Sequence, residues 1–445
     1  MDHKIASQKH LTLERPKATF TFHHKIYTIS KCDCKLVKNE LSMYFQRDIS
    51  ERIRKLGSQY PAVILTGARQ TGKTTLLKEI YPDHKYISLD LPSDAELAEN
   101  DPEQFFKLVG DDNVIIDEAQ YAPKMFRYLK ILIDKNRKSY GKFILTGSQK
   151  FNLMKEVSDS LAGRCVWLEL EGLSLSELSS MESVKNGPSF LLQFMVRGSQ
   201  PELWERPELD PSEYYRTYLA TYLERDVRQI VNISSLRDFE RFLRIMAVRN
   251  GQLLNFSDVA KDVGTSPNTV KQWTSILEAS NQIYLLEPYF SNTGKRVIKS
   301  PKVYFNEVGM LSFLLGFHKG NIEQSPFIGN LWETLVCSEF RKAMKNKKPQ
   351  SSLWFYRDQQ AREVDFLFEH SNSLDFFEIK WSTAVPNDKD LKSLHGVYKD
   401  MEKKGRLMVN LGKKFLLSRV EKPYLKGDVE VLNLDYFRTH AQKIP

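Results

Sequence analysis

The sequence predicts an α/β fold built around a parallel sheet, followed by a helical region and a second α/β region. Three observations predict this order. Short apolar runs typical of buried strands recur between residues 62 and 146, with helical segments between them. The chain becomes helical after Gly187-Pro188, and a helix followed by strands returns after Pro326. With 445 residues, the chain is long enough for two to four domains of roughly 150 residues each.

The predicted parallel sheet has four strands. Each is a short apolar run, and in order they occupy residues 62–65, 86–90, 114–117 and 142–146. Helical spacing of apolar residues predicts helices before and between these runs, at residues 49–57, 76–80 and 125–133. A β-α-β order of this kind places helices on both faces of a parallel sheet.

The rest of the chain divides into an extension and three further segments. Helices are expected at 212–233 and 237–248, and residues 316–326 have the composition of a linker. The N-terminal stretch is irregular apart from one hairpin-like run, and the sequence reveals no role for it. We therefore expect an extension, a sheet domain, a helical connector, a second helical domain and a C-terminal α/β domain, at residues 1–45, 46–205, 206–250, 251–315 and 316–445.

The composition excludes several classes of protein. Hydrophobic residues make up 41% of the chain and charged residues 27%, so it is not wholly disordered, collagen-like or a coiled-coil rod. No apolar run reaches the roughly 18 residues that span a bilayer. The N-terminal residues lack the apolar core of a secretory signal. We therefore expect no membrane association.

Net charge and cysteine usage indicate the surroundings in which the protein works. The net charge is 65 − 56 = +9, which suits a polyanionic partner such as DNA or RNA, although a solvated surface would have the same balance. The four cysteines are too scattered for a disulfide framework and indicate a cytoplasmic protein. Cys32 and Cys34 follow His23 and His24, but no second cysteine pair completes a zinc site.

A phosphate-binding loop follows the first predicted strand. Residues 67–74 fit the pattern G-x-x-x-x-G-K-[ST] and precede a predicted helix, as the motif requires. The main-chain N–H groups of such a loop cradle an anion, and the helix N-terminus adds a partial positive charge. We expect Lys73 to reach the β- and γ-phosphates of ATP, and Thr74 to bind Mg²⁺. The predicted nucleotide-contacting residues are Gly67, Ala68, Arg69, Gln70, Thr71, Gly72, Lys73, Thr74 and Thr75.

Further catalytic candidates follow the third and fourth strands, because ligands bind at the carboxyl edge of a parallel sheet. We expect Asp117 to hold Mg²⁺ through water and Glu118 to activate the attacking water. Ser148 would sense the γ-phosphate or orient that water. Hydrolysis also requires positive charge on the γ-phosphate in the transition state. The candidates for it, each of which could instead form a surface ion pair, are Arg164, Arg225 and Arg228.

A helix-turn-helix pattern lies in the second helical domain. Two short helices are expected at 256–263 and 268–277, with a Gly-bearing turn between them. A strand at 283–286 and a hairpin tip at 292–294 complete the outline of a winged helix. Basic residues follow this tip, namely Lys295, Arg296, Lys299 and Lys302. Such a wing suits DNA, but the second helix has Lys271 among uncharged polar residues, so a protein-contact module stays open.

The C-terminal domain has carboxylates in a pattern typical of Mg²⁺-dependent nucleases. Glu333 borders the apolar stripe of an amphipathic helix. Asp365 lies in a predicted strand at 363–368, and Glu378 and Lys380 share one face of the next strand. Carboxylates bind hard cations, and the lysine would position or activate water. An exposed strand with alternating charge would have the same pattern.

Together these blocks resemble a family of bacterial and archaeal P-loop ATPases in which an AAA-type domain precedes a DUF4143 region. The matching blocks are 67–75, 114–120, 143–149, 161–164, 222–228, 260–288, 295–305, 363–368 and 378–380. The resemblance implies an AAA-like P-loop NTPase fold, then a winged helix, then a restriction-endonuclease-like fold. It also implies a nuclease-like site at Glu333, Asp365, Glu378 and Lys380. Asn306-Glu307 departs from the family, which usually has an Asp before a Gly-Leu.

Three functional hypotheses follow. The leading one is a Mg²⁺-dependent ATPase that couples ATP binding and hydrolysis to a DNA-binding or nuclease-like module. Its cofactors would be ATP and Mg²⁺, with a second Mg²⁺ or Mn²⁺ at the C-terminal carboxylates. The alternative is a nucleotide-gated binding switch whose nuclease-like fold is catalytically silent. The third is a homo-oligomeric motor in which Arg225 or Arg228 completes the ATP site of a neighbouring subunit.

Overall fold

The computed structural model divides into two units, Met1–Tyr44 and Phe45–Pro445. It describes residues 18–22, 25–29, 44–148, 160–179, 188–228, 236–289, 299–317, 322–346, 350–404 and 409–434. In the first unit, β1 (Ala18–Phe22) and β2 (Lys25–Ile29) pair antiparallel, which confirms the expected hairpin. The His and Cys residues at 23–24, 32 and 34, which do not complete a zinc motif, lie outside the described residues.

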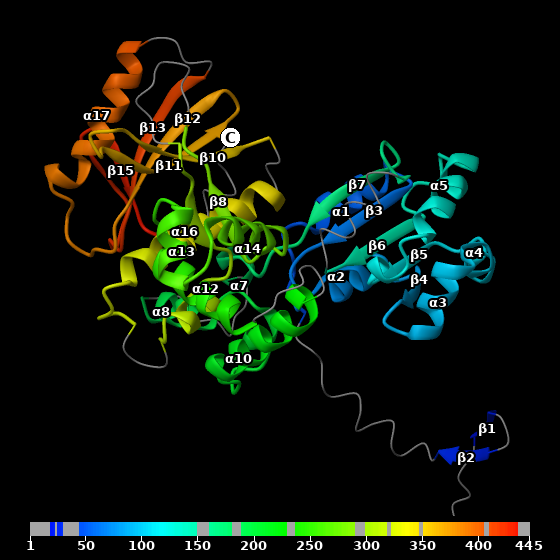
Figure 1. Ribbon diagram of the computed structural model, residues 1–445. Coiled ribbons are helices and arrows are strands. Elements are labelled where there is room, and N and C mark those ends of the chain that lie inside the picture. Colours follow the sequence, from blue (N-terminus) through cyan, green and yellow to red (C-terminus); the bar gives the residue numbers. More distant parts are fainter. Residues whose placement is uncertain are drawn as a thin grey trace, which may run out of the picture. The chain divides into compact units, whose positions relative to one another are not determined.

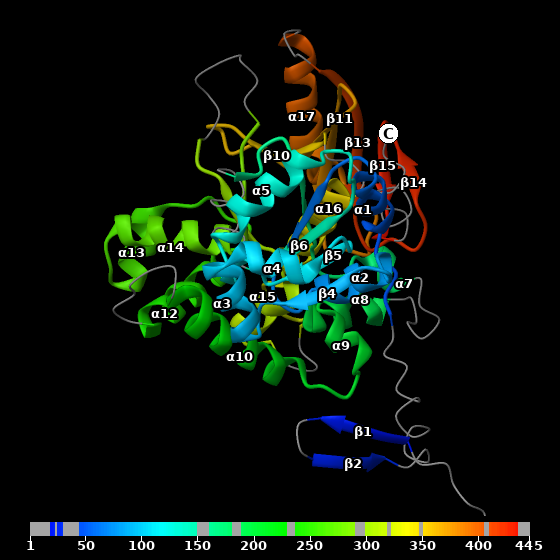
Figure 2. The same ribbon diagram turned by 90° about the vertical axis from the view of Figure 1, so that its right-hand side faces the viewer.

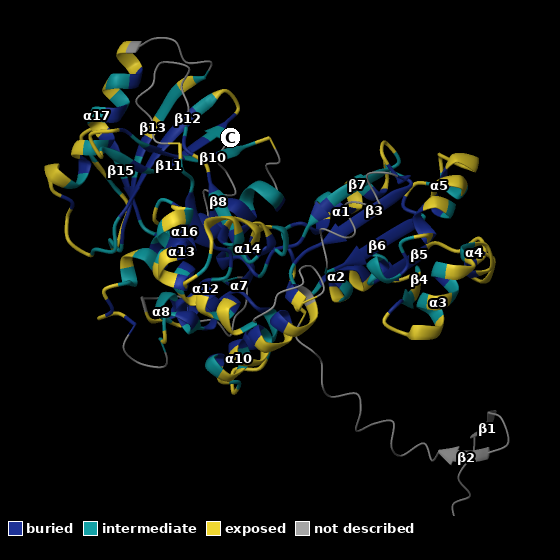
Figure 3. Ribbon diagram, viewed as in Figure 1, coloured by how far each residue is buried: buried dark blue, intermediate teal, exposed yellow. Residues whose placement is uncertain are grey.

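The second unit begins with a five-stranded parallel sheet (Figure 1). Its strands lie side by side in the order β4-β5-β6-β3-β7. They span Ala62–Thr66 (β3), Lys85–Ser88 (β4), Val114–Asp117 (β5), Phe143–Gly147 (β6) and Cys165–Glu169 (β7). The three central strands are buried throughout, as their unbroken apolar runs predict (Figure 3). The edge strand β7 was not predicted, and its residues are mostly only partly buried.

Helices cover both faces of this sheet because alternate side chains of each strand point to opposite faces. Val63 and Leu65 pack against α1 and α2, whereas Ala62 and Ile64 pack against α3, α4 and α5. The helices span Ser50–Gly57 (α1), Lys73–Ile80 (α2), Pro92–Asn100 (α3), Pro102–Val109 (α4) and Met125–Lys135 (α5). The predicted alternation of strands and helices is therefore confirmed.

The middle of the chain is helical. Its first helices are Leu175–Ser179 (α7), Pro188–Arg197 (α8), Pro201–Glu205 (α9) and Pro211–Tyr222 (α10). A π-helical turn, η3 (Leu223–Val227), follows α10 directly, so the helix predicted at 212–233 changes its winding after Tyr222. Residues 229–233 of that prediction lie outside the described part of the chain.

Three helices and a two-stranded sheet follow. The helices are Leu236–Val248 (α12), Phe256–Val263 (α13) and Pro267–Ala279 (α14). Gly264 adopts a left-handed conformation between α13 and α14, and the Ser266 side chain caps α14, so the predicted helix-turn-helix pair is present. Strands β8 (Ile283–Leu286) and β9 (Lys302–Phe305) pair antiparallel before α15 (Val308–Leu314). The expected hairpin tip at 292–294 lies outside the described residues.

The C-terminal region is a six-stranded mixed sheet between two helices (Figures 1 and 2). Helices α16 (Ile328–Asn346) and α17 (Asp388–Lys404) pack on opposite faces. The strands lie in the order β10-β11-β12-β13-β15-β14, with β12, β13 and β15 parallel to one another. They span Ser352–Arg357 (β10), Glu363–His370 (β11), Ser373–Ile379 (β12), Asn410–Leu417 (β13), Tyr424–Lys426 (β14) and Val429–Leu432 (β15).

A single apolar core joins the middle helices to the C-terminal sheet. It includes Tyr304 from β9, Trp332 and Phe340 from α16, and Phe366 and Phe377 from the sheet. Phe340 packs against three aromatic rings of the sheet, with ring centroids 4.9–5.8 Å apart. Within the described residues, no helix combines the length and apolar character needed to cross a membrane.

Candidate functional site

The phosphate-binding loop connects β3 to α2. Gly67 has a φ of 151° and Gly72 a φ of 87°, and both conformations favour glycine. A Cβ atom at Gly67 would lie 2.2 Å from the main-chain oxygen of Leu170, the residue that follows β7. The backbone of the loop is therefore too close to this residue for Gly67 to be replaced by a residue with a side chain. The Thr71 hydroxyl donates to the carbonyl of Ala68 at 2.9 Å and closes the turn.

Lys73 folds back over the loop. Its Nζ donates to the carbonyl oxygens of Gly67 and Ala68, at 3.1 and 2.8 Å, and the side chain is buried. The ammonium therefore already lies against the loop that the motif assigns to phosphate. A bound triphosphate would supply stronger anionic partners for the same ammonium.

Asp117 lies beside the start of α2. Its Oδ2 accepts from the Thr74 hydroxyl at 2.6 Å and from the Tyr86 hydroxyl at 2.8 Å. Burial and the Asp117 carboxylate raise the pKa of Tyr86 to about 12, so Tyr86 remains a donor at neutral pH. Tyr86 was missed by sequence reasoning, although it lies on the neighbouring strand β4. The arrangement brings together two oxygen groups, Thr74 and Asp117, that suit Mg²⁺.

Glu118 projects from the end of β5 with a left-handed backbone, φ 54°. Its Oε2 accepts from the Ser148 hydroxyl at 3.2 Å and from the side-chain amide of Gln120. Ser148, which follows β6, therefore lies beside Glu118, the carboxylate predicted to activate water. Parallel strands end at the same edge of the sheet, which is why these two sequence-distant residues meet. Gln149, the last residue of the matching block 143–149, lies outside the described residues.

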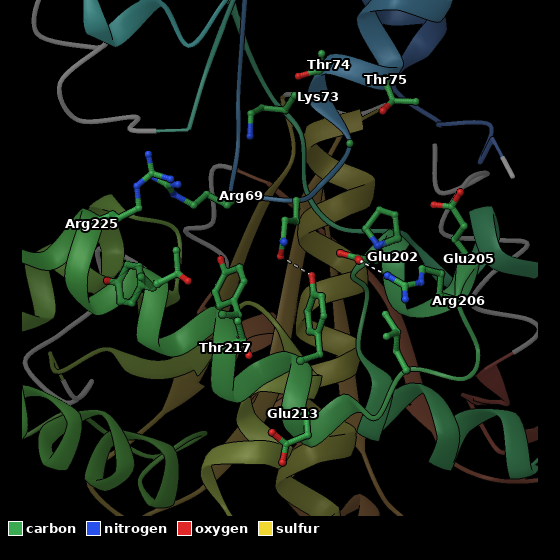
Figure 4. Close-up of a pocket in the computed structure, with 18 of the residues that line it drawn as sticks. Arg69, Lys73, Thr74, Thr75, Glu202, Glu205, Arg206, Glu213, Thr217 and Arg225 are labelled. Carbon is green, nitrogen blue, oxygen red and sulfur yellow. Dashed lines mark hydrogen bonds and ion pairs between the residues drawn. The ribbon is translucent and has the colours of Figure 1, made fainter. Parts of the chain in front are cut away.

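A cleft of about 950 Å³ opens between the loop and helices α9 and α10 (Figure 4). Loop residues Arg69, Lys73 and Thr74 line one wall, and Glu118 also lines the cleft. The opposite wall includes Tyr214, whose hydroxyl donates to the Gln70 side chain at 2.7 Å. Burial raises the pKa of Tyr214 well above its ordinary value, so this contact persists at neutral pH. The helical region thus closes directly over the phosphate loop.

The three candidate arginines lie in different places. Arg225, on η3, lines the cleft, and Figure 4 shows it on the same side as Arg69. Arg164 donates to both oxygens of Asp134 on α5, at 2.8 and 2.9 Å, and is not among the residues lining the cleft. Arg228 pairs with Glu224 at 2.5 Å on an exposed surface and does not line the cleft either. Only Arg225 of the three is therefore on the wall that faces Lys73.

Arg47, which sequence reasoning missed, supports the loop from behind. Its guanidinium donates to the carbonyl oxygens of Thr71 and Glu171, both at 2.7 Å, and of Gly172 at 3.2 Å. It also forms an ion pair with Glu177 at 3.2 Å, and both side chains are buried. No motif covers Arg47, because its partners lie 24 to 130 positions away along the chain.

The second predicted site lies at α16 and the β11–β12 hairpin. Asp365 precedes Phe366 and Glu378 follows Phe377, and these two phenylalanines pair across the hairpin. The structure brings Glu333, Asp365, Glu378 and Lys380 together, and adds Glu363. We call the four acidic residues the C-terminal carboxylate cluster: Glu333, Glu363, Asp365 and Glu378. Burial raises the pKa of Asp365 well above its ordinary value, and nearby Glu378 and Glu333 raise it further.

Lys302 corrects one sequence expectation. It was predicted to be one of the basic residues of a wing that suits DNA, but its side chain is only 3% exposed and lies inside the C-terminal carboxylate cluster. Its Nζ is 3.2 Å from Glu333 Oε1 and 2.5 Å from Glu363 Oε1. Burial lowers the pKa of Lys302, but Glu333, Asp365 and Glu363 outweigh burial and raise it. Within the residues described, no three His, Cys, Asp or Glu side chains are grouped as ligands of one metal ion.

Fold and loop together define a P-loop ATPase domain joined to a C-terminal α/β module. Comparison with known families agrees: residues 59–179 match the AAA domain, residues 189–321 a domain of unknown function (DUF8612) and residues 328–437 a domain of unknown function (DUF4143). The chain therefore carries an AAA-type P-loop ATPase domain followed by DUF8612 and DUF4143 regions, and the resemblance found in the sequence is confirmed.

Two uncharacterized proteins and one solved structure are similar to parts of this chain. Uncharacterized protein Rv2008c of Mycobacterium tuberculosis is 29% identical over 350 residues, which cover 78% of this chain and 76% of that protein. Uncharacterized protein MJ1637 of Methanocaldococcus jannaschii is 25% identical, covering 68% of this chain and 71% of its own. Among solved structures, a Walker-type ATPase of Pyrococcus abyssi is 14% identical, with a TM-score of 0.41, covering 61% of this chain and 96% of its own.

Proposed function

We propose that this protein is a Mg²⁺-dependent ATPase whose nucleotide state controls the position of α16 and the C-terminal module. One observation carries the ATPase: two pairs of polar side chains meet beside the phosphate loop. Thr74 meets Asp117 at 2.6 Å, and Ser148 meets Glu118 at 3.2 Å. The first pair suits a metal and the second suits a water, and hydrolysis of a phosphoanhydride needs both.

The residues present fit MgATP. Mg²⁺ prefers a few hard oxygen ligands and keeps several waters, and the Thr74 hydroxyl and the Asp117 carboxylate are such ligands. When bound, Mg²⁺ would neutralise part of the charge on the transferring phosphoryl group. The loop amides would hold the phosphates. Lys73 would exchange its contacts with the carbonyls of Gly67 and Ala68 for contacts with phosphate oxygens.

Glu118 would accept the proton of the attacking water. Ser148 and Gln120 both donate to its Oε2, which leaves Oε1 for that water and fixes the plane of the carboxylate. Glu118 also lines the cleft, so a water molecule has access to it. This assignment gives Ser148 the orienting role foreseen from its place after the fourth strand.

Arg225 would stabilise the transition-state charge within its own chain. It lines the same cleft as Lys73 and is exposed, and no carboxylate of the described residues holds it. A role in cis predicts that the specific ATPase activity is independent of protein concentration. Arg225→Ala should lower kcat by about 100-fold or more. A role in trans, in a homo-oligomer, would instead make the specific activity fall on dilution.

The decisive experiment separates ATP binding from hydrolysis. Glu118→Gln should bind ATP with nearly the affinity of the unaltered chain in calorimetry, yet release almost no phosphate. Lys73→Ala should lose both properties. Glu205→Gln, which changes another carboxylate lining the cleft, is the matched control and should keep both. Phosphate release by Glu118→Gln at the rate of the unaltered protein would show that this site does not hydrolyse ATP.

The coupling part of the proposal rests on a buried ion network beneath the loop. Glu171, whose main-chain oxygen binds Arg47, accepts from Arg341 of α16 at 3.0 Å and from Lys345. Burial would raise the pKa of Glu171, but Arg341 and Lys345 outweigh it and hold the pKa below its ordinary value. We call this set the α16 ion network: Glu169, Glu171, Glu339, Arg341, Lys342 and Lys345.

This network joins the two functional halves of the chain. Glu339 of α16 accepts from the main-chain N–H of Leu175 at 3.0 Å, and Lys342 donates to the carbonyl of Leu173 at 2.9 Å. Arg47 touches the phosphate loop and the same segment. A movement of the loop on nucleotide binding would therefore also move α16, because breaking the buried ion pairs between them would cost several kcal/mol of free energy.

For the C-terminal part, we propose a nucleic-acid-binding module. The α13–α14 pair with β8 and β9 supports the winged-helix interpretation, and the six-stranded sheet between α16 and α17 supports the restriction-endonuclease-like one. The net charge of +9 favours a polyanion. Duplex DNA affinity, measured by fluorescence anisotropy with and without ATP, should fall steeply with salt. Salt-independent or absent binding would favour a protein partner instead.

A nuclease is the second candidate, because the hairpin brings Asp365, Glu378 and Lys380 together. Supercoiled plasmid with Mg²⁺ or Mn²⁺, in the presence and absence of ATP, tests it. Cleavage that disappears in Asp365→Ala or Lys380→Ala would establish a nuclease. No cleavage under any of these conditions would favour the nucleotide-gated switch.

A further inference from the structure

Lys302 enters the C-terminal carboxylate cluster from a different part of the chain. It is the first residue of β9, which pairs with β8 in the helical middle region. Its Nζ contacts Glu333 of α16 and Glu363 of β11, and it lies 5.6 Å from the ring centroid of Phe355 on β10. The ammonium therefore holds three elements of the C-terminal module to the middle region.

Its neighbour on the same strand strengthens this attachment. Tyr304 lies two positions along β9, so it faces the same side of the strand as Lys302. Its hydroxyl donates to Glu333 Oε1, the same oxygen that receives the Lys302 ammonium. Burial raises the pKa of Tyr304 well above its ordinary value, so the phenol stays protonated and keeps donating. One carboxylate oxygen of α16 is thus held twice by β9.

The remaining members of the cluster also have cationic or main-chain partners. Glu363 Oε2 binds Arg357 at 2.7 Å, and Glu378 Oε1 binds Lys380 at 2.7 Å. Asp365 Oδ2 accepts from the main-chain N–H of Ile379 at 2.8 Å. Within the described residues, Glu378 Oε2 is the buried oxygen of this cluster that has no hydrogen-bond partner.

Cationic side chains reach three of the four carboxylates of the cluster. Lys302 contacts Glu333 and Glu363, Arg357 contacts Glu363, and Lys380 contacts Glu378. A divalent cation binds where several carboxylate oxygens converge on one open position. The position between Glu333 and Glu363 is already taken by the buried Lys302 ammonium. A metal entering between Glu333 and Glu363 would also meet the Lys302 ammonium at contact distance.

We propose that Lys302 is the resident cation of the C-terminal carboxylate cluster. It occupies the place that a divalent metal would need, and the cluster is an ionic joint between β9 and the C-terminal sheet rather than a nuclease centre. The joint does not depend on ATP hydrolysis, so this proposal can be correct or wrong independently of the proposed ATPase activity. It predicts that removing the ammonium converts the joint into a metal site.

The experiment measures Mn²⁺ binding by the full chain without nucleotide, using calorimetry and electron paramagnetic resonance. A Thr74→Ala background removes the phosphate-loop ligand from every sample. We expect Asp365→Asn to leave Mn²⁺ binding unchanged, because the Lys302 ammonium already excludes the metal from the cluster to which Asp365 belongs. We expect Lys302→Met to gain a Mn²⁺ ion that the double variant Lys302→Met/Asp365→Asn loses. Lys299→Met, at an exposed lysine three positions earlier, should gain nothing.

Thermal unfolding supplies a second readout. Mn²⁺ should raise the melting temperature of Lys302→Met and leave that of the unaltered chain and of Lys299→Met unchanged. Two results would overturn the proposal. One is Mn²⁺ binding by the Lys302-containing chain that disappears with Asp365→Asn; this comparison is available even if Lys302→Met does not fold. The other is a folded Lys302→Met protein that gains no Mn²⁺.

Discussion

At the scale of single residues, the nucleotide site depends on groups that leave no room for substitution. Gly67 is the clearest, because Leu170 of the neighbouring connection lies where its Cβ atom would be. Leu170 is itself fixed, since its N–H donates to the carbonyl of Thr66 at 2.7 Å. The loop conformation is therefore set by the sheet on one side and by the missing side chain on the other.

Gly67→Ala should consequently distort the loop. We expect a cost of about 1–3 kcal/mol in the free energy of unfolding, together with a loss of ATP binding of at least about tenfold. Gly329→Ala is the matched control, because a Cβ atom there meets nothing within 4 Å. Denaturant unfolding and calorimetry measure both effects. Unchanged ATP affinity in Gly67→Ala would contradict the close approach seen at Leu170.

Arg164 gives a prediction that depends on pH. The Arg164 and Arg137 guanidinium groups hold the pKa of Asp134 at about 2, below its ordinary 3.8. A carboxyl whose pKa is lower in the folded chain stabilises the fold above its unfolded pKa, so this contribution is complete above about pH 4 and is lost as the pH falls toward 2. Carbon-detected NMR should find the Asp134 midpoint near 2, and nearer 3.8 in Arg164→Gln. Equal midpoints would mean that the pair does not form in solution.

At the scale of elements, short irregularities place the residues that matter. The π-helical turn η3 continues α10 with a wider winding, and Arg225 lies on it. Two loop-supporting groups also come from helix ends: Arg47 precedes α1, and Tyr214 lies in the first turn of α10. The phosphate loop is thus bound on one side by Arg47, which precedes α1, and on the cleft side by Tyr214 of α10.

Arg47→Met tests the support from behind. It removes three donors to main-chain carbonyls and leaves the buried Glu177 carboxylate without its cation. We expect the free energy of unfolding to fall by about 3–5 kcal/mol and ATP affinity to fall by about tenfold. The control is Arg54→Met on the exposed side of α1, which should change neither. A stable Arg47→Met protein with normal affinity would remove Arg47 from the account of the loop.

At the scale of the whole molecule, α16 is the element shared by both sites. Its C-terminal half carries Arg341, Lys342 and Lys345 into the α16 ion network, and its N-terminal half carries Glu333 to Lys302. The Asn306-Glu307 departure belongs to the same region. Asn306 accepts from Arg341, and Glu307 caps α15 while accepting from Ser199. The unusual pair therefore fastens the middle helices to α16.

Glu171→Gln should break the link between the loop and α16. Arg341 and Lys345 would lose their shared counter-charge in a buried position, so we expect the free energy of unfolding to fall by about 3–5 kcal/mol. Hydrogen exchange of α16 should respond to ATP in the unaltered chain and not in Glu171→Gln. The control is Glu323→Gln, which alters a half-exposed ion pair with Arg419. An equal ATP response in Glu171→Gln would disprove coupling through this network.

The sequence by itself determined the parts whose residues are contiguous. The loop at 67–74, the strand ending in Asp117, the helix-turn-helix pair and the β11–β12 hairpin all follow from local periodicity and from geometry that a few neighbouring residues impose. Ser148 meeting Glu118 was also within reach, because parallel strands end at one edge. The edge strand β7, whose residues are mostly only partly buried, was not predicted.

Only the tertiary structure decided which charged side chains are buried and with whom. Lys302 and Arg47 look like ordinary surface cations in the sequence, yet each is enclosed by partners that are far away along the chain. Burial of a charge is stable only when opposite charges and carbonyls converge on it, and that convergence depends on the packing of whole elements. No local pattern encodes it, so the cation inside the carboxylate cluster and the support beneath the phosphate loop appear only in the folded chain.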